Sequence, residues 1–354
     1  MIDILNLPYA ELVSFVREDL KEPAFRADQI WEWLWRKGAR SFDQMTNVSK
    51  TTRAILQERC VIRWPEIAGE QRSSDGTVKF LLRLADGETV ETVLIPSESR
   101  EGILRMTQCV SCQVGCAMAC TFCATGQMGF SRNMTMGEIL GQILVAREFL
   151  GETEEEPRLR NIVFMGMGEP LLNHKAVMAS LEILHDEKAF SMSPRRITVS
   201  TCGLQKGLLE LGESNLAYLA VSLHAPTQEL RERIMPKAAH WHLDDLVGTL
   251  AKYPLKTRER LTFEYLLLGG VNDQPEHARQ LGKIMARVKG KINLIVYNSV
   301  PGAPYKAPRP EDVQKFIDIL HSKRITVITR KSKGQDIAAA CGQLKAASST
   351  TDSH

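Results

Sequence analysis

Three closely spaced cysteines, Cys116, Cys120 and Cys123, form the pattern in this sequence that most clearly predicts chemistry. Thiolates favour zinc or iron-sulfur centres, so the number of ligands has to distinguish the two. Three thiolates leave one iron of a 4Fe-4S cluster without a protein ligand, and the amino and carboxylate groups of S-adenosylmethionine (SAM) can fill that vacancy. Such a cluster can cleave SAM to a 5′-deoxyadenosyl radical. A structural zinc site is the alternative, although it normally uses four ligands.

Two further cysteines, Cys109 and Cys112, precede this motif but do not share its spacing. We expect both to lie outside the metal site. Five of the eight cysteines fall between Cys109 and Cys123, which is too tight for a disulfide framework that joins distant segments. Metal or thiol chemistry is therefore the better interpretation of the cysteines.

The elements that must position these residues change in type along the chain. The first 60 or so residues have helical patterns. Two β-rich runs, 77–84 and 89–95, flank Asp86-Gly87 and predict a hairpin that bridges two domains. Strands then alternate with amphipathic helices, a pattern typical of parallel βα units. Six strands are expected near 104–109, 161–165, 196–200, 216–223, 261–268 and 292–297, and a seventh β run spans 324–329.

Six successive βα units favour a partial or closed parallel barrel over an open two-domain sheet, so the predicted fold class is α/β with a partial (β/α)6 barrel. Ligands of such barrels gather at the C-terminal ends of the strands, where polar clusters occur in this sequence. We expect an N-terminal helical accessory domain at 1–75, a β linker at 76–100, the barrel at 101–345 and a disordered tail at 346–354.

The overall composition excludes few functions. Lys and Arg total 45 against 42 Asp and Glu, so the net charge of +3 neither requires nor excludes a polyanionic partner. The sequence has no run of 18 apolar residues, and its first residues lack the basic region and apolar stretch of a secretory signal. We therefore expect a cytoplasmic protein without a membrane partner.

The segment 113–126, which contains the three cysteines, resembles the cluster loop of the RlmN and Cfr family of radical SAM adenine methyltransferases, which act on RNA. The similarity covers nearly the whole chain and is clearest at 164–173, 222–226, 301–305 and 336–344. The resemblance implies a radical SAM barrel, with a 4Fe-4S cluster and SAM as cofactors. Within this family, the segment 168–173 looks more like the branch that methylates adenine carbon-2.

The same resemblance implies a SAM pocket built from residues at the strand ends. Glycine lets the backbone approach a ligand, a glutamate can accept from the SAM ammonium, and serine, histidine or asparagine can bond its ribose and carboxylate. Without the cysteine loop, the glycine-rich turn would more often be a tight connection and the histidine a structural residue. The implied pocket residues are Gly168, Glu169, Ser200, Ser222, Leu223, His224 and Asn298.

The resemblance implies catalytic roles for three further residues. Adenine carbon-2 is electron-poor, so a radical route is required. In the family, one SAM methylates a C-terminal cysteine, matched here by Cys341, and a second SAM supplies the radical that abstracts hydrogen from that methyl. A second thiol, matched by Cys109, releases the RNA adduct through a transient disulfide bond. Glu91 matches the family's proposed proton acceptor.

Simpler interpretations compete with these roles. An isolated cysteine such as Cys341 is more often a small packed residue, and an exposed glutamate in a strand, as Glu91 could be, is common. Cys112 stands where a serine is more usual in the family, so it could compete with Cys109 for Cys341. We expect Cys112, Cys60 and Cys202 to be structural.

RNA binding could involve two basic segments. Trp31, Trp33 and Trp35 lie close to Arg36, Lys37 and Arg40 on one predicted helix, where exposed aromatic rings could stack on bases. Trp31 and Trp35 are expected to belong to the core, while Trp33 and the basic residues could be exposed. The segment 306–333 is a second candidate for phosphate contacts, although solvated helix surface explains it almost as well.

The resemblance implies 23S rRNA and tRNA as substrates, a flavodoxin-type electron donor and a monomeric enzyme. Two alternatives stay open. The first is a Cfr-like enzyme that methylates adenine carbon-8 of rRNA. The second belongs to another class, a zinc-stabilised RNA-binding protein without catalysis.

Overall fold

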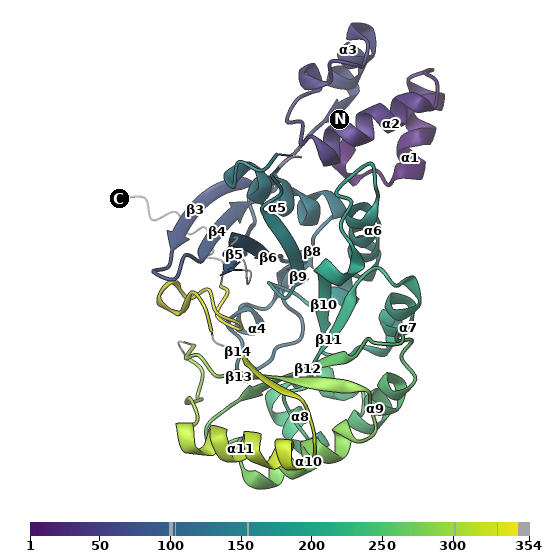
Figure 1. The fold of residues 1–354 in the computed structure, drawn as a ribbon. Coiled ribbons are helices and arrows are strands. Elements are labelled where there is room, and N and C mark those ends of the chain that lie inside the picture. Colours follow the sequence, from purple (N-terminus) through teal and green to yellow (C-terminus); the bar gives the residue numbers. More distant parts are fainter. Residues whose placement is uncertain (99–101, 103, 154–155, 301, 331, 346–354) are drawn as a thin grey trace.

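The computed structural model describes residues 1–98, 102, 104–153, 156–300, 302–330 and 332–345. Its centre is a ten-stranded sheet that curves around the short helix α4 (Figure 1). From one edge to the other, the strand order is β14-β13-β12-β11-β10-β9-β6-β5-β4-β3. The tail that was predicted to be disordered, 346–354, lies outside the described residues.

The part of the sheet from β14 to β6 is parallel, and its strands follow one another in sequence apart from the small ladder inserted after β6. This confirms the predicted succession of βα units, including the seventh β run. Because parallel strands need crossover connections, each helix between them returns the chain to the same end of the sheet. The parallel strands are β6 (Leu104–Cys109), β9 (Leu159–Phe164), β10 (Ile197–Thr201), β11 (Tyr218–Ser222), β12 (Leu261–Leu267), β13 (Gly290–Val296) and β14 (Val327–Arg330).

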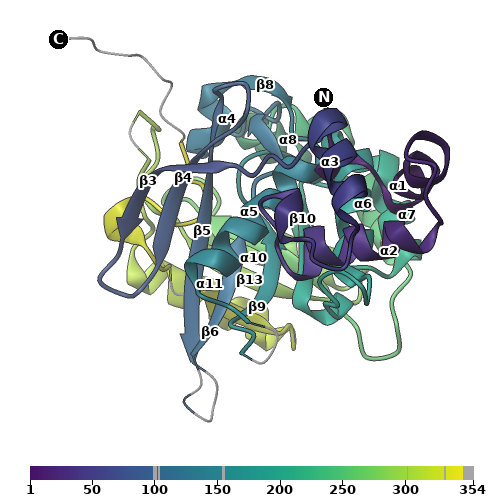
Figure 2. The same cartoon turned by 90° about the horizontal axis from the view of Figure 1, so that it is seen from above.

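The crossover helices cover the outer face of the curved sheet, as Figures 1 and 2 show from two directions. The first of them begins where Thr135 accepts from the Glu138 amide while the Glu138 carboxylate accepts from the Thr135 amide, a capping box. The helices are α5 (Met136–Phe149), α6 (His174–His185), α7 (Gln205–Ser214), α8 (Gln228–Ile234), α9 (Leu243–Ala251), α10 (Pro275–Met285) and α11 (Pro310–Ser322).

Three antiparallel strands extend the sheet beyond β6. These are β3 (Glu66–Arg72), β4 (Val78–Arg83) and β5 (Thr89–Glu98), and β5 pairs with β6 so that Val93 lies opposite Cys109. The predicted hairpin with its turn at Asp86-Gly87 is confirmed. The strands of this hairpin belong to the main sheet, and its role as a bridge between two domains stays a prediction. Most of β5 is buried on both faces, because the neighbouring strands and the C-terminal segment, residues 332–345, cover it.

The N-terminal region is helical as predicted, up to residue 59. Trp31 and Trp35 are fully buried in its core, and the Trp31 Nε1 donates to Asp186 of the barrel at 3.0 Å. This region therefore packs directly on the βα units (Figure 2). Its elements are β1 (Ile2–Asp3), α1 (Tyr9–Ser14), α2 (Phe25–Trp31), α3 (Lys50–Arg59) and β2 (Cys60–Val61), with π-helical turns at Phe15–Asp19 and Glu32–Arg36.

A separate two-stranded ladder, β7 (Gln113–Gly115) with β8 (Phe130–Asn133), follows β6 and encloses α4 (Ala124–Met128). Within the described residues, no helix combines the length and hydrophobicity needed to cross a bilayer. The domain boundaries at residues 75, 100 and 345 stay predictions.

Candidate cluster and cysteine site

The cysteine loop leaves the sheet at the C-terminal end of β6 and is closed by the β7–β8 ladder. The Cys116 amide donates to the Gly129 carbonyl at 2.7 Å. Gly115 has a φ of 75°, and a Cβ there would lie 2.1 Å from the Gly129 oxygen. A side chain at residue 115 would therefore break the base of the loop, so glycine is required there.

The three cysteines of the motif line one cavity of about 150 Å³ at the C-terminal ends of the parallel strands. Met118 and Phe122 of the same loop form an apolar wall, and Cys341 from the C-terminal segment closes another side. The predicted trio and Cys341 are thus brought together although more than two hundred residues separate them in sequence. The cavity also contains Phe164, Met165, Gly166, Gly168, Glu169, Ser200, Cys202, Ser222, His224, Met235, Glu264, Leu266, Ile295 and Gly342.

Burial dominates the electrostatics of the three thiols. It raises the pKa of Cys116 to about 12, raises that of Cys120 well above its usual value and also raises that of Cys123. Three thiolates would not coexist in this apolar environment without cationic charge between them, and a metal centre supplies such charge. In the part of the chain that the structure describes, no three His, Cys, Asp or Glu side chains converge on a single ion.

The turn after β9 brings Gly168 and Glu169 into the cavity, as the sequence predicts. Gly168 has a φ of 104°, and a Cβ there would lie 2.6 Å from the Gln113 Cβ. Glu169 is 4% exposed, and its carboxylate accepts from Thr201 Oγ1 at 2.6 Å and from the amides of Leu171 and Cys202. These bonds fix the carboxylate at the cavity wall, although burial is the largest effect on its pKa and raises it.

Two predicted serines meet a carboxylate that the sequence analysis did not include. Ser200 Oγ lies 3.2 Å from Ser222 Oγ and donates to Glu264 Oε2 at 3.2 Å. The other oxygen, Glu264 Oε1, is buried without a hydrogen bond among the described residues. Burial raises the pKa of Glu264, and the Arg330 guanidinium opposes this effect. The three side chains form a polar strip on the cavity wall that can bind hydroxyl or ammonium groups.

His224 is a neutral donor at the edge of the cavity. The Leu266 amide donates to its Nδ1 at 3.1 Å, so Nε2 carries the hydrogen. Burial lowers the pKa of His224 to about 3, with a smaller contribution from Arg231. The ring stands edge-on to Phe122 of the cysteine loop, with centroids 5.1 Å apart. The uncharged His224 ring therefore contacts both strand β12, through Leu266, and the cysteine loop, through Phe122.

Two predicted pocket residues do not line this cavity. Leu223 is fully buried, and its backbone groups bond to Glu264 and Arg231. Asn298 uses both ends of its amide, donating to Ser332 Oγ at 2.9 Å and accepting from Gln335 Nε2 at 2.6 Å. In this structure, Asn298 therefore holds the C-terminal segment against β13.

Cys341 lies between two cavities. Besides the first cavity, it lines a second one of about 260 Å³ with Arg330, Ser332, Lys333 and strands β5 and β6. Of the eight cysteines, Cys341 alone is exposed. Desolvation of the thiol by the surrounding protein nevertheless raises the pKa of Cys341, while the charge of Arg330 opposes this effect. A thiol in this position can contact groups bound on either side.

Cys109, the predicted partner of Cys341, is buried at the end of β6. Burial raises the pKa of Cys109 to about 12, and the next largest effect is the charge of Cys341, so the two thiols are close enough to interact electrostatically. All eight cysteines are free thiols here, so the transient disulfide bond between Cys109 and Cys341 stays a prediction. Cys112 is buried and lines neither of the two cavities.

Glu91 is buried rather than exposed on its strand. It is 5% exposed, its Oε1 lies 3.0 Å from Lys79 Nζ, and its Oε2 accepts from the Lys345 amide at 2.7 Å. The carboxylate therefore ties the segment that carries Cys341 to the sheet. It lines neither of the two cavities.

Sequence reasoning missed Glu264 and Arg330, and it treated Cys202 as structural. Cys202 lines the first cavity, with its Sγ 3.3 Å from Met118 Sδ. Glu264 could have been noticed, because it is the one charged residue in the apolar strand β12. Arg330 is the last residue of β14, where no motif marks it.

Two family models match separate parts of the chain. The model of the ribosomal RNA large subunit methyltransferase N-terminal domain matches residues 2–62, and the model of the radical SAM superfamily matches residues 110–281. The first match covers the helical region that precedes β3. The second covers the cysteine loop and most of the parallel strands.

The similarity extends over the full length of known proteins. A dual-specificity RNA methyltransferase RlmN from Nitratidesulfovibrio vulgaris strain DP4 is 70% identical over 98% of this chain and 95% of its own length, and one from Desulfotalea psychrophila is 44% identical over 99% and 97%. The crystal structure of a radical SAM methyltransferase from Sphaerobacter thermophilus superposes with a TM-score of 0.89, at 40% identity, over 98% of this chain and all of that one. The chain therefore belongs to the RlmN family of radical SAM methyltransferases.

Proposed function

We propose that this protein methylates carbon-2 of adenosine in 23S rRNA and in tRNA, through a methyl group carried by Cys341. The observation that carries the proposal is the position of Cys341 in the wall shared by two cavities. A carrier thiol has to meet the methyl donor on one side and the target base on the other. The relatives that are named dual-specificity RNA methyltransferases support the choice of substrates.

In this proposal, Cys116, Cys120 and Cys123 hold a 4Fe-4S cluster. When bound, the cluster supplies the electron that cleaves SAM and so generates the radical. Met118 and Phe122 surround the site with apolar side chains and keep water from it. Glu169, Ser200, Ser222 and His224 present acceptors and donors that can orient SAM, with Gly168 permitting close approach. Leu223 and Asn298 act indirectly, by positioning the strand end and the C-terminal segment.

Cys341 first takes the methyl group. Its thiolate sulfur forms a bond to the methyl carbon as the bond from that carbon to the SAM sulfonium breaks. Arg330 favours this step, because its guanidinium lowers the pKa of Cys341.

A hydrogen atom abstracted from this methyl group leaves a methylene carbon that adds to adenine carbon-2, and the adduct then loses the carbon-2 proton and one electron, which the oxidised cluster would take back. The Cys109 thiolate attacks the Cys341 sulfur, so that an S–S bond forms, the S–C bond breaks, and its electron pair goes to the methylene carbon, which takes up a proton and becomes the methyl group of the released RNA. An external thiol reductant restores the two thiols.

The second cavity is the proposed site of the target adenosine. Ile95, Pro96 and Thr107 line it, and Arg330 and Lys333 supply positive charge. The Lys333 ammonium donates to the Pro96 carbonyl at 2.7 Å, so its charge is not neutralised by that partner. This combination suits a flat base with a phosphate beside it, extruded from its loop.

Glu91 is the proposed proton acceptor for the methylated base. Its Oε1 lies 3.0 Å from the Lys79 ammonium, which holds the side chain in place, and a carboxylate is a group that can act as a general base. Because Glu91 also binds the Lys345 amide, a shift of the C-terminal segment would change its access to the second cavity.

The N-terminal region at 1–75 is the proposed RNA-binding domain, with the barrel at 101–345 as the catalytic one. The Trp33 ring is half-buried, with the Lys37 ammonium 4.3 Å from its centroid, so ring and charge form one surface feature. Such a pair can contact an RNA base and its phosphate. We also propose a flavodoxin-type electron donor and a monomeric enzyme.

Anaerobic turnover of unmethylated 23S rRNA and tRNA tests the proposal, with wild type compared with Cys341→Ala and methyladenosine isomers separated by mass spectrometry. We expect 2-methyladenosine from wild type, and none from the variant, which should still cleave SAM. Cys60→Ala is the matched control, because it removes a buried cysteine of the N-terminal region.

Each other result has a definite meaning. Methylation by Cys341→Ala would show that another residue carries the methyl. Formation of 8-methyladenosine would place the enzyme with the Cfr-like alternative. A colourless, zinc-containing protein without labile sulfide would support the non-catalytic alternative.

A further inference from the structure

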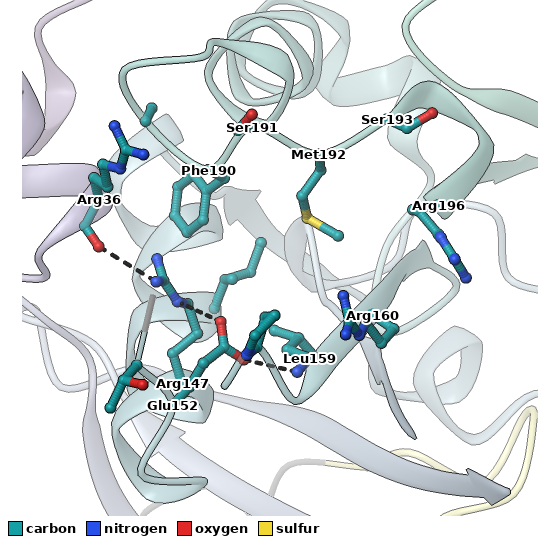
Figure 3. A pocket seen from close by; sticks show the side chains of 14 residues that line it. Arg36, Arg147, Glu152, Leu159, Arg160, Phe190, Ser191, Met192, Ser193 and Arg196 are labelled. Carbon is teal, nitrogen blue, oxygen red and sulfur yellow. Dashed lines mark hydrogen bonds and ion pairs between the residues drawn. The ribbon is translucent and has the colours of Figure 1, made fainter. Parts of the chain in front are cut away.

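A pocket of about 380 Å³ lies at the opposite ends of the parallel strands from the cysteine loop, where β9 and β10 begin (Figure 3). It is separate from both cavities that contain Cys341. Its walls come from the N-terminal region, from α5 and from the segments that precede β9 and β10. The lining residues include the four arginines Arg36, Arg147, Arg160 and Arg196.

One of these arginines is structural. Arg147 Nε pairs with Glu152 Oε1 at 2.9 Å, and its Nη atoms donate to the carbonyls of Trp35 and Arg36. The second oxygen of Glu152 accepts from the amides of Arg158 and Leu159. The only carboxylate among the described lining residues is therefore fully engaged.

The other two arginines at this end of the pocket, Arg160 and Arg196, form no ion pair with a described residue. Arg160 is the second residue of β9 and Arg196 directly precedes β10, the neighbouring strand, which pairs with β9 at Ile162 and Ile197. Figure 3 shows both side chains at the same end of the pocket. Arg196 donates to the neutral Asn161 Oδ1 at 3.4 Å. Among the described residues, no carboxylate lies within ion-pair distance of either guanidinium. Two such groups beside one pocket repel each other unless an anion lies between them.

The rest of the pocket suits a ligand larger than inorganic phosphate. Met192 and Phe190 contribute apolar side chains to the lining, and Ser191 and Ser193 contribute hydroxyl groups. The volume is within the range of small-molecule sites, about 300–1,000 Å³. Apolar side chains and two guanidinium groups in the same pocket match a nucleotide, with the base against the apolar side chains and the phosphate on the arginines.

We propose that this pocket binds a phosphate group carried by a nucleotide, either free or within an RNA chain. The proposal stands on the pocket alone and does not depend on the methylation chemistry. The N-terminal region contributes Arg36 to the pocket, and the βα units contribute the other lining residues. An RNA bound there would therefore contact both parts of the chain.

Equilibrium binding to the full-length protein tests this proposal without turnover. The two probes are adenosine 5′-monophosphate, followed by calorimetry, and a tRNA transcript, followed by fluorescence anisotropy at several salt concentrations. Arg160→Gln/Arg196→Gln removes both free charges, and Met192→Glu places a negative charge in the pocket. Arg195→Gln is the matched control, because Arg195 is an exposed neighbour outside the pocket.

A free nucleotide as ligand predicts saturable adenosine monophosphate binding that both pocket variants weaken at least tenfold and the control does not. An RNA nucleotide as ligand predicts that both variants weaken tRNA binding by about fivefold or more. The double variant would also reduce the salt slope by up to about 2, one for each lost phosphate contact. If both pocket variants bind both probes as the Arg195 control does, the pocket is not a phosphate site.

Discussion

The Nη1 atom of Arg330 lies 3.7 Å from Oε1 of Glu264 across the parallel sheet. Glu264 is on β12 and Arg330 ends β14, so the pair reaches over β13. Arg330 lowers the pKa of both Cys109 and Cys341, whereas Glu264 raises both. The two reactive thiols are therefore subject to opposing charges that can be removed one at a time.

Arg330→Gln should slow alkylation of Cys341, and Glu264→Gln should accelerate it. Loss of the guanidinium raises the pKa of the thiol, so the thiolate fraction at a given pH falls, about tenfold for each pH unit by which the pKa rises. Loss of the carboxylate has the opposite sign. Mass spectrometry of iodoacetamide-treated protein as a function of pH measures both effects, at the same cluster content. Arg324→Gln, on the exposed turn before β14, should leave the profile unchanged, and a change of the same sign in both variants would disprove this explanation.

Lys79→Met should destabilise the protein strongly, because it leaves the Glu91 carboxylate buried without its partner. The side chains of the pair are only 10% and 6% exposed, and loss of one partner of a buried pair typically costs about 3–5 kcal/mol. The free energy of unfolding in urea measures this. Arg309→Met, which breaks an exposed pair with Asp312, should cost less than about 1 kcal/mol. Equal losses in the two variants would mean that Glu91 is not held in a desolvated ion pair.

Gly168→Ala should reduce both stability and SAM cleavage, whereas Gly87→Ala should affect stability only slightly. Both glycines have positive φ, 104° and 88°, so both variants incur backbone strain of about 1 kcal/mol. Only at residue 168 does the new methyl meet atoms, those of Gln113, and such overpacking adds about 1–3 kcal/mol. Thermal unfolding and 5′-deoxyadenosine release compare the two. Identical behaviour would show that the turn after β9 tolerates a side chain.

His224 should make stability fall as the pH is lowered. Its pKa is about 3 in the folded protein and 6.5 in the unfolded chain, so between these values the unfolded state binds more protons. The stabilisation is complete above pH 6.5 and is lost towards pH 3, at up to about 1.4 kcal/mol per pH unit. His224→Gln should flatten this dependence relative to wild type in urea titrations between about pH 4 and 7. The exposed His240→Gln should not, and an unchanged slope in His224→Gln would mean that the imidazole charges freely.

The sequence allowed accurate prediction where a local pattern is tied to a physical requirement. Strand β6 was predicted with the bounds that the structure gives it, Leu104–Cys109, at the point where the pattern changes to alternating strands and helices. The hairpin turn was predicted from Asp86-Gly87, since glycine accommodates the φ of 88° found there. Cys341 was placed through a family resemblance, and the structure brings it to the three cysteines of the motif.

The remaining features depend on contacts between distant segments, which local patterns do not encode. Asn298 was expected in the SAM pocket, but two partners from the C-terminal segment take up its amide. Glu91 is buried because that same segment covers β5, and alternation within the strand could not indicate this. The Arg330–Glu264 pair joins two strands that are not adjacent in the sheet, so neither residue looks functional on its own.

The C-terminal segment is joined to the rest of the site by contacts of very long sequence separation. The Lys345 amide bonds to Glu91, 254 residues earlier, and the Thr125 hydroxyl bonds to the Leu344 carbonyl, 219 residues later. Such contacts form late, because a long loop must close before they contribute. During synthesis, the cysteine loop and the first parallel strands can therefore associate while Cys341 is still in the ribosomal tunnel. The order of translation thus separates assembly of the proposed cluster site from arrival of the thiol that is to be methylated.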